Sequence, residues 1–285
     1  VTVDTMVEGV HFVHEVSPEG VGHKLLAVSL SDVAAMGGRP TDAVVAVSAP
    51  GDCDAGYVER LYNGIFSCAD RFGVAIAGGD TTRTSGSLVL SLTLTGEMAR
   101  ERVCYRSGAQ VGDAVYVSGT LGDAAGGLAV MLGEVNLEGD DRQYLLRRLH
   151  RPEPRVALGQ ALSKANIVTA MIDVSDGVAS DLKHICKQSG VSAIIFENAI
   201  PTSSAFDRFC AMGGQSSVNL ALGGGEDYEL LFTVRPEKVE ILDALSEDFS
   251  FYRMGEVVEG SGQVILETED GTRVEVENAG YDHFR

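Results

Sequence analysis

A chain of 285 residues with 45% hydrophobic residues and only seven prolines excludes a disordered or fibrous protein and has room for two packed domains. Its net charge of -19 at pH 7 disfavours nucleic acid as a partner, because the phosphate backbone would be repelled. The longest apolar stretches are only as long as a strand, so no membrane span is predicted. An anionic substrate would be repelled by this acidic protein unless its charge were neutralised, which favours bound divalent cations over a basic pocket.

The first half of the chain alternates between strand and helix patterns. Ser17-Pro18 has the form of a helix cap followed by proline, and the apolar pattern runs from there to Gly37-Gly38. A second helix is expected between Asp54 and Gly73. The expected strands cover residues 1–4, 43–48, 74–77, 88–95 and 114–117.

The second half continues the alternation beyond a basic segment with two prolines at residues 147–154. The expected helices cover residues 154–165 and 176–188, and the expected strands cover 168–172, 193–196 and 228–234. A hairpin is expected at 264–267 and 273–276. This order predicts an α/β (α+β) protein of two domains, residues 1–118 and 119–285, with the boundary anywhere between 96 and 154.

The cysteines indicate the cellular compartment, and the first residue bears on where the natural chain begins. The five cysteines are odd in number and form no CxxC pair, which predicts buried thiols in a reducing cytoplasm. Residue 1 is a valine within an expected strand, and no signal-peptide pattern is visible. We therefore expect the natural chain to begin further upstream.

Aspartates recur at or just after the ends of expected strands, each beside Gly, Ser or Thr. These residues are Asp4, Asp80, Asp173 and Asp176. In an open α/β sheet such positions face one crevice, where converging carboxylates need a cation between them. Taken alone, each is more often a helix cap or a turn residue. Asp32 lies in an otherwise uncharged helical run, so it must be paired, hydrogen-bonded, metal-bound or protonated, and a structural capping role fits equally well.

Glycine runs at residues 119–127 and 223–225 could let the backbone approach a phosphate, although such runs are more often turns. Neither run matches a P-loop or a GxGxxG fingerprint, and no GxSxG or HExxH motif is present. His11 could contact a ligand, but a lone histidine is more often structural.

Eight segments in this order resemble the thiamine-monophosphate kinase family over essentially the whole chain. Looser forms of them occur in aminoimidazole ribonucleotide synthetase, selenophosphate synthetase and a hydrogenase-maturation protein. The segments are DTMVEGVHF (4–12), KLLAVSLSDVAAMGGRP (24–40), AGGDTT (77–82), RSGAQVGD (106–113), RPEPR (151–155), IDVSDGVASDL (172–182), GGEDYELLFT (224–233) and GYDHF (280–284).

The resemblance implies an aminoimidazole ribonucleotide synthetase-like fold. Its N-terminal domain would bind ATP and several Mg²⁺ ions and would pair its sheet with that of a second subunit in a homodimer. The implied metal ligands are Asp4, Asp32, Asp80, Asp173 and Asp176, with Asp80, Asp176 and Arg106 central to catalysis. The implied contacts with ATP come from Tyr62, Gly79, Asp80, Arg106 and Ser175. The implied contacts with thiamine monophosphate come from His11, Glu226 and Tyr281.

The implied reaction forms thiamine diphosphate in thiamine biosynthesis by in-line transfer of a phosphoryl group, with no general base because the acceptor phosphate has a second pKa of about 6. The chain departs from the family in two places. It starts after the family's acidic Gly-Asp-Asp segment, which carries a metal ligand, and Val3 replaces the usual Ser or Thr. The alternatives are another ATP-dependent enzyme of the superfamily and a non-catalytic binder of a nucleotide or thiamine phosphate.

Overall fold

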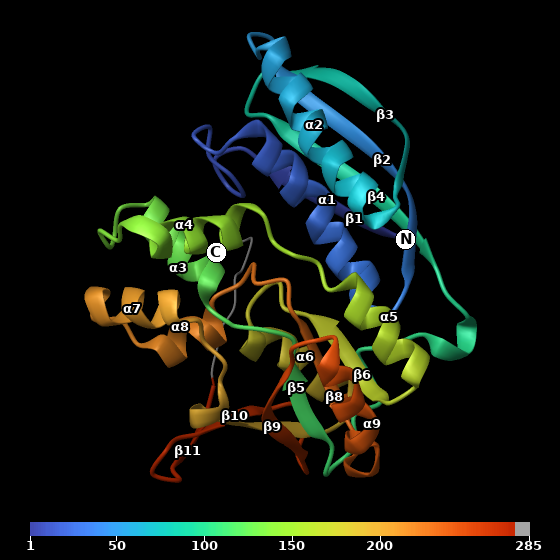
Figure 1. Ribbon diagram of the computed structural model, residues 1–285, viewed down its shortest axis with the longest axis vertical. Helices are drawn as coiled ribbons and strands as arrows, with labels where there is room; N and C mark the ends of the chain where they lie inside the picture. The colour runs from blue at the N-terminus through green and yellow to red at the C-terminus, as the bar shows by residue number, and fades with distance from the viewer. Residues whose placement is uncertain (277–285) are drawn as a thin grey trace.

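The computed structural model describes residues 1–276, which form an N-terminal half and a C-terminal half with a sheet each (Figure 1). The first sheet has four strands in the order β1-β4-β2-β3. Its strands are β1 (Thr2–Val7), β2 (Arg39–Pro50), β3 (Ala75–Thr84) and β4 (Val89–Glu97). Strands β2 and β3 run parallel through the crossover helix α2 (Ala55–Phe72), and the other pairs are antiparallel.

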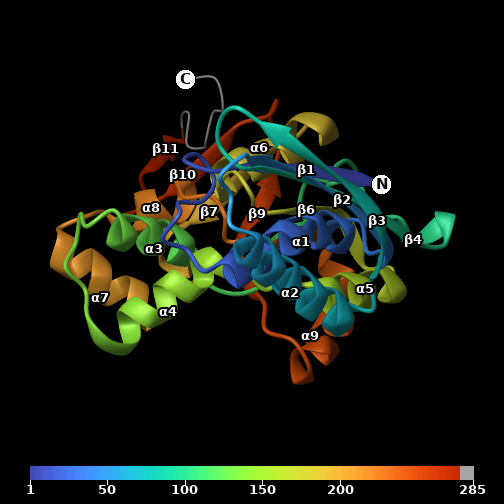
Figure 2. The same ribbon diagram turned by 90° about the horizontal axis from the view of Figure 1, so that it is seen from above.

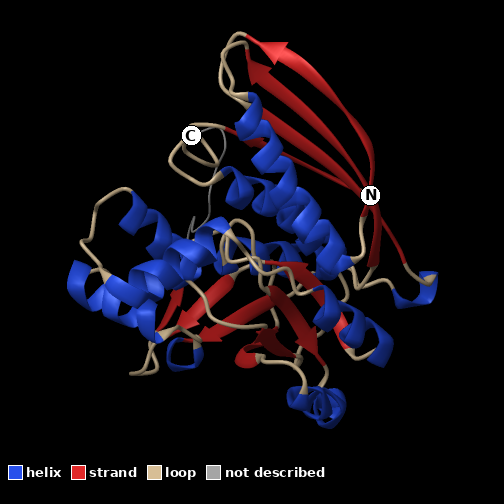
Figure 3. Ribbon diagram, turned by 45° about the horizontal axis from the view of Figure 1, so that its top comes forward, coloured by secondary structure: helices blue, strands red, loops and turns tan. Residues whose placement is uncertain are grey.

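One face of this sheet is covered by helices. Figure 3 shows α1 (Pro18–Ala35) and α2 on the same side of the four strands. The alternation along β2 buries Ala43, Val45 and Val47, which point toward the helices. Val44 points the other way and is 44% exposed. The second face of the sheet therefore keeps apolar side chains in contact with solvent.

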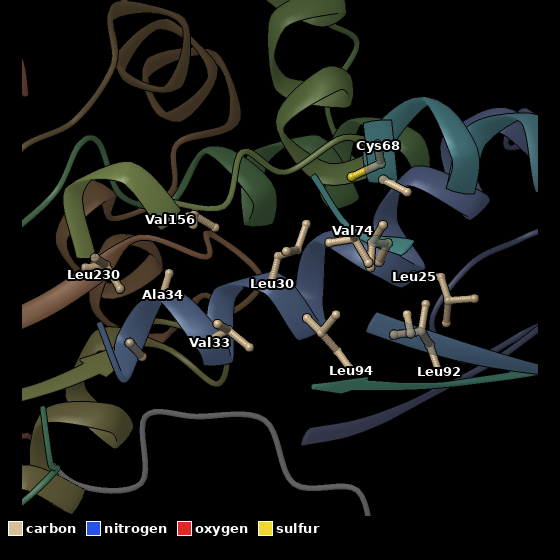
Figure 4. Close-up of a cluster of buried hydrophobic side chains, with 14 of the residues drawn as sticks. Leu25, Leu30, Val33, Ala34, Cys68, Val74, Leu92, Leu94, Val156 and Leu230 are labelled. Atoms are coloured by element: carbon tan, nitrogen blue, oxygen red, sulfur yellow. The ribbon is translucent and has the colours of Figure 1, made fainter. Parts of the chain in front are cut away.

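Helix α1 lies at the centre of the molecule. It begins as expected at Ser17, whose hydroxyl accepts the backbone N–H of Gly20 at 3.1 Å. The helix is buried on nearly all sides, since it packs on α2 and β4 and also on α5 (Val156–Ala165) of the second half (Figure 4). Gly64 of α2 allows the close crossing with α1, because a Cβ there would overlap the carbonyl oxygen of Glu19.

The second sheet has seven strands in the order β11-β10-β7-β9-β5-β8-β6. Only β7 and β10 pair in parallel within it. Its strands are β5 (Ala114–Val117), β6 (Val168–Asp173), β7 (Ser192–Phe196), β8 (Leu230–Val234), β9 (Tyr252–Val258), β10 (Val264–Glu267) and β11 (Arg273–Glu275).

Two hydrophobic cores lie on the two faces of the second sheet. On β8, Leu230 and Phe232 face the core around α1 and α5, whereas Leu231 faces the core around α6 (Val178–Ser189). Four further helices gather at one end of the molecule, away from α5 and α9 (Figure 2). They are α3 (Asp123–Met131), α4 (Gly139–His150), α7 (Ser204–Gly213) and α8 (Ser217–Gly223), while α9 is Val239–Asp243. Short 3₁₀ segments lie at Arg100–Arg102, Glu197–Ala199, Pro236–Lys238 and Ala244–Glu247.

The structure differs from the sequence expectations mainly around the glycines. Strand β3 does not end at Ala77 but continues through Gly79 and Asp80. This part of the strand is exposed and lacks apolar alternation, and its hydrogen bonds to β2 along one edge keep it extended. Asp4 likewise lies in the middle of β1 rather than at its end. Helices α3, α4, α7, α8 and α9 and strand β9 were not predicted. Strand β5 pairs with β8 and β9, so the change from the first sheet to the second falls between Glu97 and Ala114.

The remaining expectations concern membranes and thiols. None of the helices within residues 1–276 combines the length and apolar character that crossing a bilayer requires. All five cysteines are free, and four of them are buried as predicted, but Cys53 is only partly buried.

Candidate active site

A pocket of about 830 Å³ opens between the two halves of the chain. Its walls come from β1 and the loop after it, from α1, α3 and α4, and from the loops that precede α6 and β8. Apolar side chains of α3 and of the loop after β1 line part of it. Its ionisable side chains are those of Asp4, His11, Lys24, Asp32, His150, Asp173, Asp176, Glu226 and Tyr228. The described lining is therefore strongly acidic.

Two of these carboxylates come from the N-terminal half. The hydroxyl of Ser29 donates to Asp4 Oδ2 at 2.5 Å, and the hydroxyl of Thr2 donates to Asp32. Burial raises the pKa of Asp4, and the charge of Asp32 raises it as well, although the Ser29 hydrogen bond lowers it. Asp32 is therefore hydrogen-bonded, as its apolar sequence context required.

Asp173, the last residue of β6, brings a third carboxylate from the C-terminal half. Its side chain is 3% exposed and accepts the hydroxyl of Ser31 at 2.7 Å. Burial raises the pKa of Asp173 to about 7, and the charge of Asp32 adds to the rise. Helix α1 thus presents a hydroxyl and a carboxylate to the end of β6.

The loop after β6 carries Ser175 and Asp176, and Asp181 holds it in place. Asp181 Oδ2 accepts the backbone N–H groups of Ser175 at 3.0 Å and of Asp176 at 3.2 Å. Burial raises the pKa of Asp181 to about 8, and the charges of Asp173 and Asp176 contribute. The two N–H bonds fix the direction of the loop toward the pocket.

A second loop, residues 224–229, lies against the first. Tyr228 donates its N–H to the carbonyl of Val174, and Glu226 donates its N–H to the carbonyl of Ser175, both at 2.8 Å. Glu226 and Tyr228 have φ angles of 68° and 51°, a strained region for non-glycine residues that is often found at functional sites. Burial and the charges of Glu226 and Asp173 raise the pKa of Tyr228 well above its usual value, so the phenol stays protonated.

Two buried carboxylates, Asp227 and Glu229, anchor the far side of this loop. Asp227 accepts the N–H groups of Gly122 at 2.8 Å and of Ala124 at 3.2 Å, at the start of α3. Glu229 is fully buried and accepts hydrogen bonds from Arg148 at 2.8 Å and from Arg155 at 2.6 Å. The loop is therefore held on both sides.

Lys24 of α1 reaches the same loop from the N-terminal half. Its ammonium lies 2.6 Å from Glu226 Oε1. Burial lowers the pKa of His150 to about 4, and the positive charge of Lys24 contributes. The imidazole of His150 is therefore neutral at pH 7, and Lys24 is the only permanent cation among the described side chains that line the pocket.

The pocket brings together many of the residues predicted from the sequence. It is lined by Asp4, His11, Asp32, Asp173, Ser175, Asp176 and Glu226. The Nδ1 atom of His11 accepts the N–H of Val7 at 3.0 Å. Within residues 1–276, no three acidic, histidine or cysteine side chains form a complete group of metal ligands.

Other predicted residues lie elsewhere. Tyr62 packs against the core on α2, and Gly79 and Asp80 are exposed on β3. Arg106 is exposed before β5 and does not line the pocket, although its charge lowers the pKa of Asp173. Tyr281 lies outside the described residues.

Lys24, Asp181 and Tyr228 were not predicted as site residues. All three fall inside segments that carry the family resemblance, so that resemblance is the signal that could have found them. The roles of Lys24 and Tyr228 depend on contacts between distant parts of the chain, which spacing alone does not reveal. Asp181 acts locally, on the backbone five and six positions before it.

Known proteins resemble this chain over its whole length. Residues 1–98 match the N-terminal domain of AIR synthase related proteins, and residues 110–267 match the C-terminal domain. Thiamine-monophosphate kinase from Salmonella typhimurium is 40% identical over all of this chain and 86% of the relative. The Bacillus subtilis enzyme of that name is 37% identical over all of this chain and 88% of the relative.

Two solved structures share the fold. The structure described as AaThiL complexed with AMPPCP and TMP has a TM-score of 0.89 and 35% identity, covering 99% of this chain and 86% of that one. Thiamine-monophosphate kinase from Stenotrophomonas maltophilia has a TM-score of 0.86 and 40% identity, covering 94% and 84% of the two chains. The two-domain aminoimidazole ribonucleotide synthetase-like fold predicted from the sequence is thereby confirmed, and the chain belongs to the thiamine-monophosphate kinase family.

Proposed function

We propose that this protein transfers the γ-phosphoryl group of ATP to the phosphate of thiamine monophosphate, giving thiamine diphosphate and ADP. The observation that carries the proposal is the single pocket in which both halves of the chain place aspartates, namely Asp4, Asp32, Asp173 and Asp176. The likeness to a structure that holds AMPPCP and TMP supports the choice of the two substrates.

The aspartates fit magnesium by their chemistry. Mg²⁺ prefers carboxylate oxygens and keeps part of its shell for water and substrate phosphates, so an incomplete set of protein ligands suits it. The raised pKa values of Asp4 and Asp173 reflect burial and the charge of Asp32, a repulsion that a bound cation would relieve. Bound Mg²⁺ would neutralise the phosphates of ATP and acceptor and hold them in line.

The residues of the chain need to align the reactants rather than remove a proton. The acceptor phosphate has a second pKa of about 6 and is largely a dianion at neutral pH. Asp176 and Ser175 would be held toward the reacting phosphates by Asp181. We propose that Arg106 stabilises the transferred phosphoryl group and that Ser175 contacts ATP, while His11, Glu226 and Tyr281 contact the acceptor.

We propose a homodimer to account for the residues on β3. The edge strands of the first sheet are β1 and β3, so two copies could close their four strands each into an eight-stranded barrel. The exposed sheet face with Val3 and Val44 would fill its interior. Gly79 and Asp80 would then lie beside β1 of the second copy and serve its ATP and metal site, and Tyr62 would contact the adenine.

Sedimentation equilibrium tests the assembly. The wild type is expected to be a dimer, and Val44→Asp is expected to give folded monomers, because the change places a charge in the interior of the barrel. A wild-type monomer that is fully active would refute this arrangement.

Chromatographic assay of the reaction tests the function. The protein is incubated with ATP, Mg²⁺ and thiamine monophosphate, and the thiamine esters and ADP are separated by anion exchange. Equal amounts of thiamine diphosphate and ADP are expected, with loss of product in EDTA and in Asp176→Asn but not in Asp248→Asn, which changes an exposed aspartate outside the pocket. Binding of both substrates without product would point to a non-catalytic binder, and turnover only with another acceptor would point to a different enzyme of the superfamily.

A further inference from the structure

Lys24 is a buried cation in the lining of the pocket. Its side chain is 4% exposed, and a lysine is rarely buried to this extent without a partner of opposite charge. The partner is Glu226, whose Oε1 lies 2.6 Å from the ammonium. Lys24 belongs to α1 and Glu226 to the loop before β8, so this ion pair connects the two halves of the chain.

The position of Glu226 is fixed from two directions. Its backbone N–H is bound to the carbonyl of Ser175 at 2.8 Å, on the loop that also carries Asp176. Its carboxylate is held by Lys24 through Oε1, and Oε2 makes no hydrogen bond within residues 1–276. The Glu226 side chain is 31% exposed, against 4% for Lys24. Glu226 is therefore the more exposed member of the pair, although both residues line the pocket.

We propose that Lys24 is a positioning residue that selects the acceptor through Glu226. By supplying the counter-charge for Oε1, Lys24 keeps the carboxylate in one direction with Oε2 open to the pocket. A carboxylate held in this way suits an acceptor whose organic part is a permanent cation, as a thiazolium ring is. The inference rests on the proposed function, in which Glu226 contacts the acceptor.

A direct role for Lys24 in phosphate binding fits the geometry less well. The ammonium would have to leave a buried ion pair to bind a phosphate, and the departure would leave Glu226 without its partner. The positioning role needs no such movement.

A double-mutant cycle on the acceptor KM tests the proposal. The variants are Lys24→Met, Lys24→Arg, Glu226→Gln and Lys24→Met with Glu226→Gln, and the control is Lys164→Met, which removes an exposed lysine of α5 that does not line the pocket. Lys24→Met is expected to raise the KM for thiamine monophosphate by about tenfold or more and to leave the KM for ATP within about twofold. Lys24→Arg is expected to recover part of the loss.

The double variant separates the two roles of Lys24. If Lys24 acts through Glu226, the double variant has the same acceptor KM as Glu226→Gln alone. If the two effects multiply, Lys24 contacts the substrate itself and the proposal is wrong. The double variant also removes both charges of the pair, so it remains informative if Lys24→Met alone does not fold.

Acceptor charge gives a second readout that a purely structural role would not change. An analogue of thiamine monophosphate with a neutral aromatic ring in place of the thiazolium is expected to have a much higher KM in the wild type, and Lys24→Met and Glu226→Gln should reduce that preference. If Lys24→Met keeps the wild-type preference for the charged acceptor, the proposal is wrong, although the kinase reaction itself stands. Absence of any turnover in the wild type would instead refute the proposed function.

Discussion

Replacing Glu229 with Gln should destabilise the protein, because the change removes one buried charge. Glu229 is 0% exposed and accepts hydrogen bonds from Arg148 at 2.8 Å, from Arg155 at 2.6 Å through both Nε and Nη2, and from Ser118 at 2.8 Å. Gln keeps the shape of the side chain but removes the charge. The two guanidinium groups, with side chains 12% and 32% exposed, then lose their shared counter-charge.

The expected loss is large because removing one partner of a buried ion pair costs about 3–5 kcal/mol. For a protein of this size, each kcal/mol shifts Tm by about 2–4 °C, so Glu229→Gln should lower Tm by roughly 6–20 °C. The loop that carries Glu226 and Tyr228 ends at the same anchor, so activity should fall at temperatures where the variant is still folded.

Thermal unfolding followed by far-ultraviolet circular dichroism measures this loss, with Glu267→Gln as the matched control. Glu267 also pairs with an arginine, Arg273 at 2.8 Å, but their side chains are 28% and 57% exposed. An exposed pair contributes about 0–1 kcal/mol, so the control should lose at most a few degrees. Equal losses in the two variants would refute the argument that the buried network anchors the loop.

Two further variants test Asp173, which lines the pocket, and Asp80, which lies on β3. Burial raises the pKa of Asp173 from 3.8 to about 7, and the charge of Asp32 contributes. The folded protein therefore binds this proton more tightly than the unfolded chain does, so the free energy of unfolding falls as the pH rises from about 4 to about 7. Asp173→Asn removes this charge, so in EDTA it should stabilise the protein by up to about 4 kcal/mol at pH 8. The same variant should abolish turnover, because it removes a proposed metal ligand. Denaturant melts in which the gain in stability did not shrink toward pH 4 would contradict the argument. Asp80→Asn should lower kcat by at least about 100-fold and change Tm by under about 2 °C, since the side chain is exposed on β3. Steady-state kinetics and thermal melts measure the two effects, and loss of activity together with loss of folding would disprove the prediction.

Local sequence signals were sufficient for the elements with clear ends. Ser17 and Pro18 mark the start of α1, and Asp54 and Gly73 bracket α2, because capping side chains and left-handed glycines act on their immediate neighbours. The edge strand β3 was predicted too short, since Gly79 and its polar neighbours have no apolar alternation and depend on pairing with β2.

The arrangement of the candidate site depends on contacts that no spacing encodes. Ser31 and Asp173 are 142 positions apart in the chain, yet they share a buried hydrogen bond behind the lining residue Asp173. The family resemblance supplied the aspartates as a set, but it did not indicate that Lys24 faces Glu226 or that Asp181 orients the loop at Asp176. The Lys24–Glu226 pair follows from the packing of α1 against the C-terminal half, whereas the Asp181 contact forms between the start of α6 and the loop just before it.

The most direct test of the central claim is ³¹P NMR of the protein mixed with ATP, Mg²⁺ and thiamine monophosphate. We expect the thiamine monophosphate singlet to be replaced by the two doublets of thiamine diphosphate while ATP is converted to ADP, with no inorganic phosphate released. Release of inorganic phosphate with the monophosphate singlet unchanged, from protein shown to bind both ligands, would contradict direct transfer between the two phosphates.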